Sequence, residues 1–149
     1  KFTKENFYLY HKGGNLGTSL RLAKDIMVTG KKMPVIDHKK NLSQALKVMN
    51  QKKLGIVVVT KNRYISAIIS DGDLRRMLND KTKKKNLSEI NKNFPIVIGE
   101  NTPASKALGF MSEKKITSLL VVSDNNKNKK GKILKGIIHI HFLLKEGIS

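Results

Sequence analysis

The sequence contains no cysteine among its 149 residues, which excludes disulfide bonds and thiolate metal ligands. This absence is consistent with a reducing compartment, and we expect a cytoplasmic protein. The sequence also lacks an apolar run long enough to span a membrane, and its N-terminus does not resemble a signal peptide. We therefore expect no membrane partner. Because the first residue is Lys1 rather than methionine, we expect the chain to be a piece of a longer protein.

Acidic residues are scarce, since 11 Asp and Glu stand against 30 Lys and Arg and give a formal net charge of +19. A charge of this size is typical of proteins that bind nucleic acid. However, nearly all of the basic residues are lysine, and they are scattered or gathered in loop-like stretches such as 80–86 and 125–132. No aromatic residues alternate with them to stack on bases. The pattern favours a solvated surface over a polyanion-binding site, and we expect no nucleic-acid partner.

An internal repeat divides the chain. Residues 33–60 align with residues 94–122, and residues 67–74 align with residues 136–143 once a polar insertion is allowed for. The matches include a proline, an Ala-Leu pair, a methionine and a Lys-Lys pair. The hydrophobic content of 39% is sufficient for a folded core. The chain is therefore interpreted as two copies of one unit.

Each copy is expected to form a strand, a helix, two strands and a short helix, in that order. The first helix has a cap in both copies: Asn41 with Gln44, and Thr102 followed by Pro103. Apolar residues at helical spacing mark the core faces of these helices: Leu42, Ala45, Leu46, Met49, Ala104, Ala107, Leu108 and Met111. We predict an α+β (α/β) fold in which tandem β-α-β-β-α repeats pack together about a pseudo-twofold axis, with clefts where strand ends meet the closing helices.

The stretch SAIISDGDLRRML, residues 66–78, places a hydroxyl and two carboxylates at a strand-to-helix junction. Ser70-x-x-Asp73 fits a capping box. Two carboxylates fall far short of the oxygen ligands that calcium requires. A third interpretation is a ligand site, in which the hydroxyl and helix N–H groups hold a phosphate and the carboxylate accepts hydrogen bonds from a ribose diol. Capping and ligand binding are compatible, since a phosphate can take the place of the cap.

The tandem pattern of a small residue, two hydrophobic residues, Ser/Thr and Asp after a strand resembles the cystathionine β-synthase (CBS) domain pair, or Bateman module. In that family the hydroxyl and carboxylate contact the phosphate and ribose of a nucleotide, which implies these roles for Ser70 and Asp73. The second copy departs from the pattern, because His139 replaces the hydroxyl and Phe142 replaces the aspartate. The resemblance therefore implies at most one ordinary nucleotide site and a modified one.

The flanking segments are similar to the C-terminal half of D-arabinose 5-phosphate isomerases, which join a sugar isomerase (SIS) domain to a CBS pair. HKGGNLG, leading into DIM, is the most specific part of this likeness, although Lys12 stands where the family usually has proline. The resemblance implies that residues 1–20 are the tail of an SIS domain with its linker, and that residues 24–80 and 87–147 are the two CBS repeats. His11 would match the catalytic histidine, but only in the full-length enzyme.

His139 and His141 are separated by one residue and, on a strand, would point to the same face. They could begin a zinc site, but no third ligand is fixed by spacing, and we predict no metal and no cofactor. We instead expect the imidazoles to face an anionic ligand. Arg76 can add positive charge near that ligand. The other candidate ligand-binding residues are Gly55, Thr117 and Ser118.

The resemblance implies a regulatory module that senses a nucleotide or nucleotide-sugar for its own SIS domain. The implied pathway makes 3-deoxy-D-manno-octulosonate (Kdo) for lipopolysaccharide or capsule. CMP-Kdo is therefore an expected feedback ligand, with AMP or ATP as the alternative. Other hypotheses are a ligand-free oligomerisation module, or the CBS pair of a sugar nucleotidyltransferase. We expect the chain itself to be non-catalytic and dimeric, and the full-length enzyme to be a tetramer.

Overall fold

The first repeat forms a three-stranded sheet in the computed structural model, which describes residues 20–77, 86–89 and 95–148. Strand β1 (Val35–Asp37) runs parallel to β2 (Ile56–Lys61), and β3 (Tyr64–Ser70) returns antiparallel beside β2. Helix α4 (Leu42–Lys52) connects β1 to β2. Helix α5 (Asp71–Met77) follows β3 without a loop.

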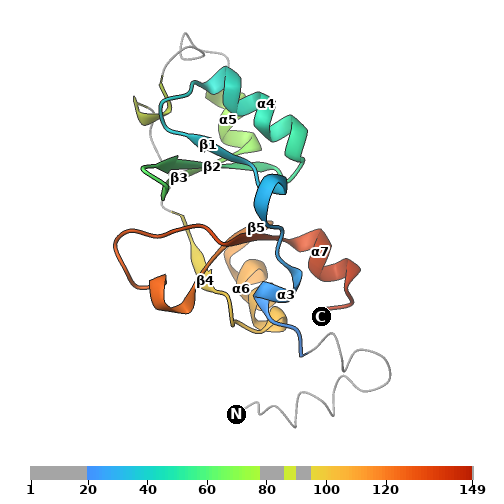
Figure 1. The fold of residues 1–149 in the computed structure, drawn as a ribbon. Coiled ribbons are helices and arrows are strands. Elements are labelled where there is room, and N and C mark those ends of the chain that lie inside the picture. The colour runs from blue at the N-terminus through green and yellow to red at the C-terminus, as the bar shows by residue number, and fades with distance from the viewer. Residues whose placement is uncertain (1–19, 78–85, 90–94, 149) are drawn as a thin grey trace.

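The second repeat has the same order and the same strand directions (Figure 1). Strand β4 (Val97–Gly99) is parallel to β5 (Ser118–Val122), and β6 (Gly136–His139) is antiparallel to β5. Helix α6 (Ala104–Lys114) connects β4 to β5, and helix α7 (Ile140–Lys145) follows β6 directly. The tandem β-α-β-β-α architecture expected from the internal repeat is therefore confirmed.

A short helical segment precedes each repeat in the sequence, and each of these segments packs on the other repeat. Helix α3 (Ala23–Ile26) precedes β1, yet it lies beside α6 of the second repeat (Figure 1). The Ala23 amide donates to the carbonyl of Thr102 at 2.7 Å. Conversely, the 3-10 turn η2 (Leu87–Glu89) precedes β4 but places Leu87 in the core of the first repeat. Each lobe is thus completed by residues outside its own repeat.

The two long helices begin differently. Helix α4 has the expected reciprocal cap, because the Asn41 side chain accepts from the Gln44 amide and the Gln44 side chain accepts from the Asn41 amide, both at 3.0 Å. The prediction for α6 is wrong by one residue, since Pro103 is the N-cap rather than the first helical residue. The reason is tertiary: Pro103 forms a bridge with Leu22. That pairing holds Pro103 outside the helical conformation, with a ψ of 139°, and the helix begins at Ala104.

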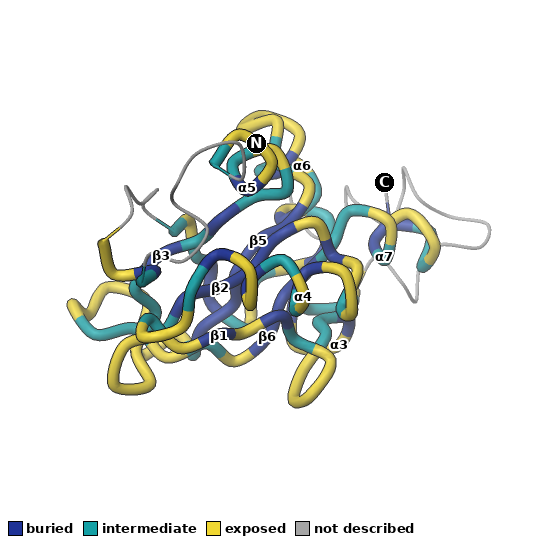
Figure 2. Tube along the Cα trace, turned by 90° about the horizontal axis from the view of Figure 1, so that it is seen from above, coloured by how far each residue is buried: buried dark blue, intermediate teal, exposed yellow. Residues whose placement is uncertain are grey.

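The core has three parts, one within each repeat and one between them. Strands β2 and β5 are buried along most of their length, as continuous apolar runs predict (Figure 2). The core faces predicted for α4 and α6 are buried, with Leu46 and Leu108 only partly so. The cluster between the repeats contains Leu54, Ile56, Val58, Leu120 and Ile137. Burial of this cluster holds the two sheets together as one body.

Two short 3-10 turns complete the described elements, η1 (Gly30–Lys32) before β1 and η3 (Asp124–Asn126) after β5. None of the helices in the part of the chain that the structure describes has the length and apolar character required to cross a membrane.

Candidate functional site

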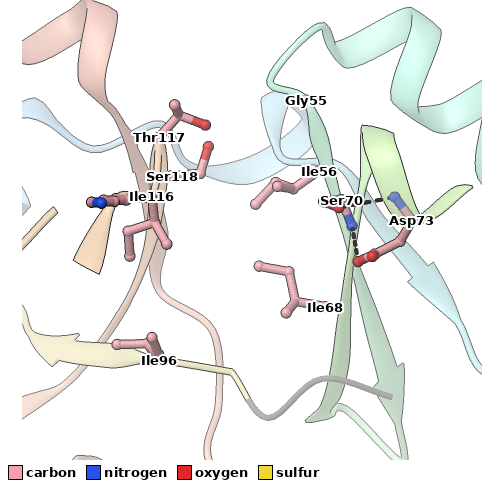
Figure 3. A pocket seen from close by; sticks show the side chains of 10 residues that line it. Gly55, Ile56, Ile68, Ser70, Asp73, Ile96, Ile116, Thr117 and Ser118 are labelled. Carbon is pink, nitrogen blue, oxygen red and sulfur yellow. Dashed lines mark hydrogen bonds between the residues drawn. The ribbon is translucent and has the colours of Figure 1, made fainter. Parts of the chain in front are cut away.

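A cavity of about 410 Å³ lies between the two repeats at the ends of β3 and α6 (Figure 3). One wall comes from the first repeat and contains Ser70 and Asp73. The facing wall comes from the second repeat and contains Thr117. The lining residues are Gly55, Ile56, Ile68, Ser70, Asp73, Ile96, Lys115, Ile116, Thr117 and Ser118. The cavity therefore exists only because the two copies are packed together.

Ser70 and Asp73 form a reciprocal cap at the start of α5. The Asp73 amide donates to Ser70 Oγ at 3.1 Å, and the Ser70 amide donates to Asp73 Oδ2 at 3.2 Å. The other carboxylate oxygen, Oδ1, accepts a hydrogen bond from the Arg76 guanidinium at 2.6 Å. The capping interpretation of this motif is thus confirmed, and the same two side chains also face the cavity.

The charge state of Asp73 follows from these contacts. Burial raises the pKa of its carboxyl group, but hydrogen bonding to the Ser70 backbone and side chain, together with Arg76, outweighs this effect. The pKa of Asp73 therefore lies below its ordinary value. Asp73 is a carboxylate at neutral pH and can only accept hydrogen bonds. Arg76 does not line the cavity, and its side chain is 74% exposed.

The facing wall is positioned by the end of α6. Lys115 closes this helix in the left-handed conformation with a φ of 57°, which turns the chain into β5. Thr117 and Ser118 follow, and the Ser118 hydroxyl donates to the carbonyl of Leu54 at 3.2 Å. Ser118 is buried, so its hydroxyl joins the two repeats rather than pointing freely into the cavity. Gly55, beside Leu54, has a φ of +74°, a conformation that glycine adopts without steric cost.

Four isoleucines form the apolar part of the cavity. Ile56 and Ile68 lie on the first repeat, and Ile96 and Ile116 lie on the second, with their side chains around the same space in Figure 3. Together with Lys115, these residues were missed by the sequence interpretation. Ile68 could have been predicted from the sequence, because residues two apart on a strand share a face and Ser70 was already a candidate.

The two histidines lie away from this cavity, and the prediction that both stand on one strand is wrong. His139 ends β6 and caps α7, accepting from the His141 amide through Nδ1 at 3.1 Å. His141 is therefore in the first turn of α7, and the two rings stack with centroids 4.8 Å apart. Burial, together with the neighbouring His141, lowers the pKa of His139. Neither residue lines the cavity between Ser70 and Thr117.

The candidate catalytic histidine, His11, lies outside the described residues. Within the described ranges, no group of three or more His, Cys, Asp or Glu side chains is arranged to hold a metal ion.

Comparison with known proteins agrees with this architecture. The CBS domain family matches residues 23–80 and 87–145. An uncharacterized protein of Rickettsia prowazekii is 38% identical over 99% of this chain and 44% of its own length. The arabinose 5-phosphate isomerase KdsD of Escherichia coli K12 is 36% identical over the same shares of the two chains. The chain therefore spans less than half the length of these relatives.

Among solved structures, CBSX2 in complex with AMP superimposes with a TM-score of 0.70 and 22% identity, covering 85% of this chain and 95% of that one. CBSX2 is a CBS-pair protein of Arabidopsis thaliana. At this identity the likeness shows the fold alone. The family model and the curated relatives thus confirm the resemblance seen in the sequence: the chain belongs to the CBS domain family, as a tandem pair of CBS domains related in sequence to arabinose 5-phosphate isomerases.

Proposed function

We propose that the cavity between Ser70 and Thr117 binds a nucleotide or nucleotide-sugar that regulates the enzyme to which this CBS pair belongs. The observation that carries the proposal is the cavity itself, because it is built from both repeats and combines an apolar interior with polar groups at its edges. A ligand held there contacts both repeats at once.

The chemistry of the lining residues suits a nucleotide. Asp73 is ionised and can accept hydrogen bonds from the two hydroxyls of a ribose. Lys115 and Thr117 on the facing wall can hold a phosphate or carboxylate by charge and hydrogen bonding. The isoleucines provide the apolar surface that a base requires, and a volume of about 410 Å³ lies within the range of small-molecule sites.

Regulation requires that the ligand bind two arrangements of the repeats with different affinities. A ligand in this cavity touches one repeat through Ser70 and the other through Thr117, so its affinity depends on their separation. We propose that the parent protein is a cytoplasmic arabinose 5-phosphate isomerase of Kdo synthesis. CMP-Kdo is then the expected feedback ligand, because it carries ribose, phosphate and a carboxylate. The AMP bound to CBSX2 supports adenine nucleotides as the alternative.

Calorimetric titration of the chain with CMP-Kdo, CMP, AMP and ATP at moderate salt tests this function. Asp73→Asn retains a capping oxygen but loses the negative charge. A hydrogen bond to a charged group contributes about 1.5–3 kcal/mol, so we expect this variant to weaken binding about tenfold or more.

Asp71→Asn is the matched control. Asp71 is on the same helix, pairs with the exposed Arg75 at 3.1 Å and does not line the cavity. If Asp73→Asn bound the ligand with the same affinity as the wild type, Asp73 would not be part of the binding site. Absence of saturable heat with all four ligands would contradict the function, and a stable dimer without ligand binding would favour an assembly role.

A further inference from the structure

Arg76 lies outside the cavity but contacts a residue that lines it. Its side chain is 74% exposed and is not part of the lining. The side chain of Asp73, about one helical turn earlier on α5, is 17% exposed and lines the cavity. The Arg76 guanidinium donates to Asp73 Oδ1 at 2.6 Å. Asp73 therefore connects the interior of the site to a cation at the surface.

The Asp73 carboxylate is held at both of its oxygens. Oδ2 accepts a hydrogen bond from the Ser70 amide at 3.2 Å, and Oδ1 accepts one from Arg76. The terminal torsion of an aspartate is soft, so a single contact leaves the orientation of the carboxylate loosely defined. A second contact, from a charged donor, narrows that orientation. Two ribose hydroxyls require both oxygens in fixed places, because each hydroxyl donates along its own direction.

Arg76 also acts on the charge of this carboxylate. Burial raises the pKa of Asp73, hydrogen bonding within the cap lowers it, and Arg76 lowers it further by its charge and its hydrogen bond. Among the other charged groups of this region, Asp71 pairs with Arg75 at 3.1 Å on the same helix, and Lys115 lies on the facing wall of the cavity. Arg76 is thus a cation in direct contact with the carboxylate.

We propose that Arg76 is a positioning residue of this site: without touching the ligand, it holds the Asp73 carboxylate in the orientation that the ribose hydroxyls require. This role differs from the direct contact between Arg76 and an anionic ligand that we expected from the sequence. The inference rests on the proposed function for its ligand, but the action of Arg76 on Asp73 is also tested without one.

Replacement of Arg76 by methionine removes the charge and the hydrogen bond but keeps an unbranched side chain at this exposed position. In calorimetric titrations with CMP-Kdo and AMP, we expect Arg76→Met to bind about two- to fivefold more weakly than wild type. Arg76→Lys keeps the positive charge and should lie closer to wild type than to Arg76→Met. Arg75→Met is the matched control, because Arg75 is 76% exposed on the same helix and pairs with Asp71 instead; its affinity should be unchanged.

A double-mutant cycle separates positioning from direct contact with the ligand. If Arg76 acts through Asp73, then Arg76→Met should have little further effect on affinity once Asp73→Asn is present. If Arg76 touches the ligand itself, the same loss of affinity should appear in both backgrounds. The second result would overturn the inference.

The pH dependence of binding gives an independent measurement. Asp73 accepts hydrogen bonds from both hydroxyls only as a carboxylate, so binding is present above the pKa of Asp73 and is lost as pH falls through it. Because Arg76 lowers this pKa, we expect Arg76→Met to lose affinity at a higher pH than wild type. Titration of the ligand itself is the same for both proteins and cancels in the comparison.

NMR titration of the side-chain carboxyl carbons tests the contact in the chain without ligand. The midpoint for Asp73 should be higher in Arg76→Met than in wild type and unchanged in Arg75→Met. Equal midpoints for wild type and Arg76→Met would overturn the inference, as would equal affinities for a ligand that binds. If neither CMP-Kdo nor AMP binds, the proposed function fails, and the NMR titration alone then decides whether Arg76 controls Asp73.

Discussion

Replacing Ser118 by alanine removes the hydroxyl that joins the two repeats through the Leu54 carbonyl. The hydrogen bond is 3.2 Å long, and Ser118 is 7% exposed, so water has little access to replace the lost donor. Leaving a buried carbonyl without its partner costs about 1–3 kcal/mol. In a chain of this length each kcal/mol lowers Tm by about 2–4 °C, so we expect a decrease of roughly 2–12 °C.

Urea and thermal unfolding followed by circular dichroism measure this effect. Ser112→Ala is the matched control, because Ser112 is exposed on α6 and lies outside the contact between the repeats. The reasoning predicts a lower free energy of unfolding for Ser118→Ala with little change for Ser112→Ala. A Ser118→Ala protein that unfolds at the same urea concentration as wild type would refute the assigned role of this hydrogen bond.

Two other sites give equally direct tests. Gly136 lies so close to the Met27 side chain that an added Cβ would overlap it, whereas an added Cβ at Gly109 in α6 meets nothing within 4 Å. We therefore expect Gly136→Ala to lower Tm, and Gly109→Ala to raise stability by roughly 0.5–1 kcal/mol through helix propensity; equal Tm values would contradict this. The pKa of His139 is lowered by burial and His141, so its contribution to stability is complete above the unfolded pKa of about 6.5 and decreases as pH falls below it. His139→Asn keeps a capping side chain and should lessen the loss of stability between about pH 7.5 and 5.5, and an unchanged pH dependence would count against this origin.

The sequence was sufficient to predict the repeat, because its signals are local. Helical spacing of apolar residues, the Asn41 cap and the Ser70–Asp73 cap all depend on neighbours within a few positions. The start of α6 was misplaced because its position depends on Leu22, about eighty residues earlier in the chain. His141 was assigned to a strand because the apolar run continues past His139, whereas in the structure the His139 side chain caps a helix there.

Three residues of the candidate site, Ile96, Lys115 and Ile116, could not be predicted for the same reason. Ser70 and Asp73 carry a recognisable motif, so they were found. Lys115 and Ile116 have no motif of their own, and they reach the cavity only through the packing of one repeat on the other. Ile96 joins them from the segment before β4. Contacts of this kind depend on the relative position of the two lobes, which no local pattern encodes.

The central claim is that a nucleotide binds between the repeats at Ser70 and Asp73. A crystal structure of the chain with the tightest-binding of CMP-Kdo, CMP, AMP and ATP tests it most directly. We expect ligand density between Asp73 and Thr117, with the ribose hydroxyls on the carboxylate. Ligand density elsewhere, with no ligand atom in contact with Asp73, would contradict the account.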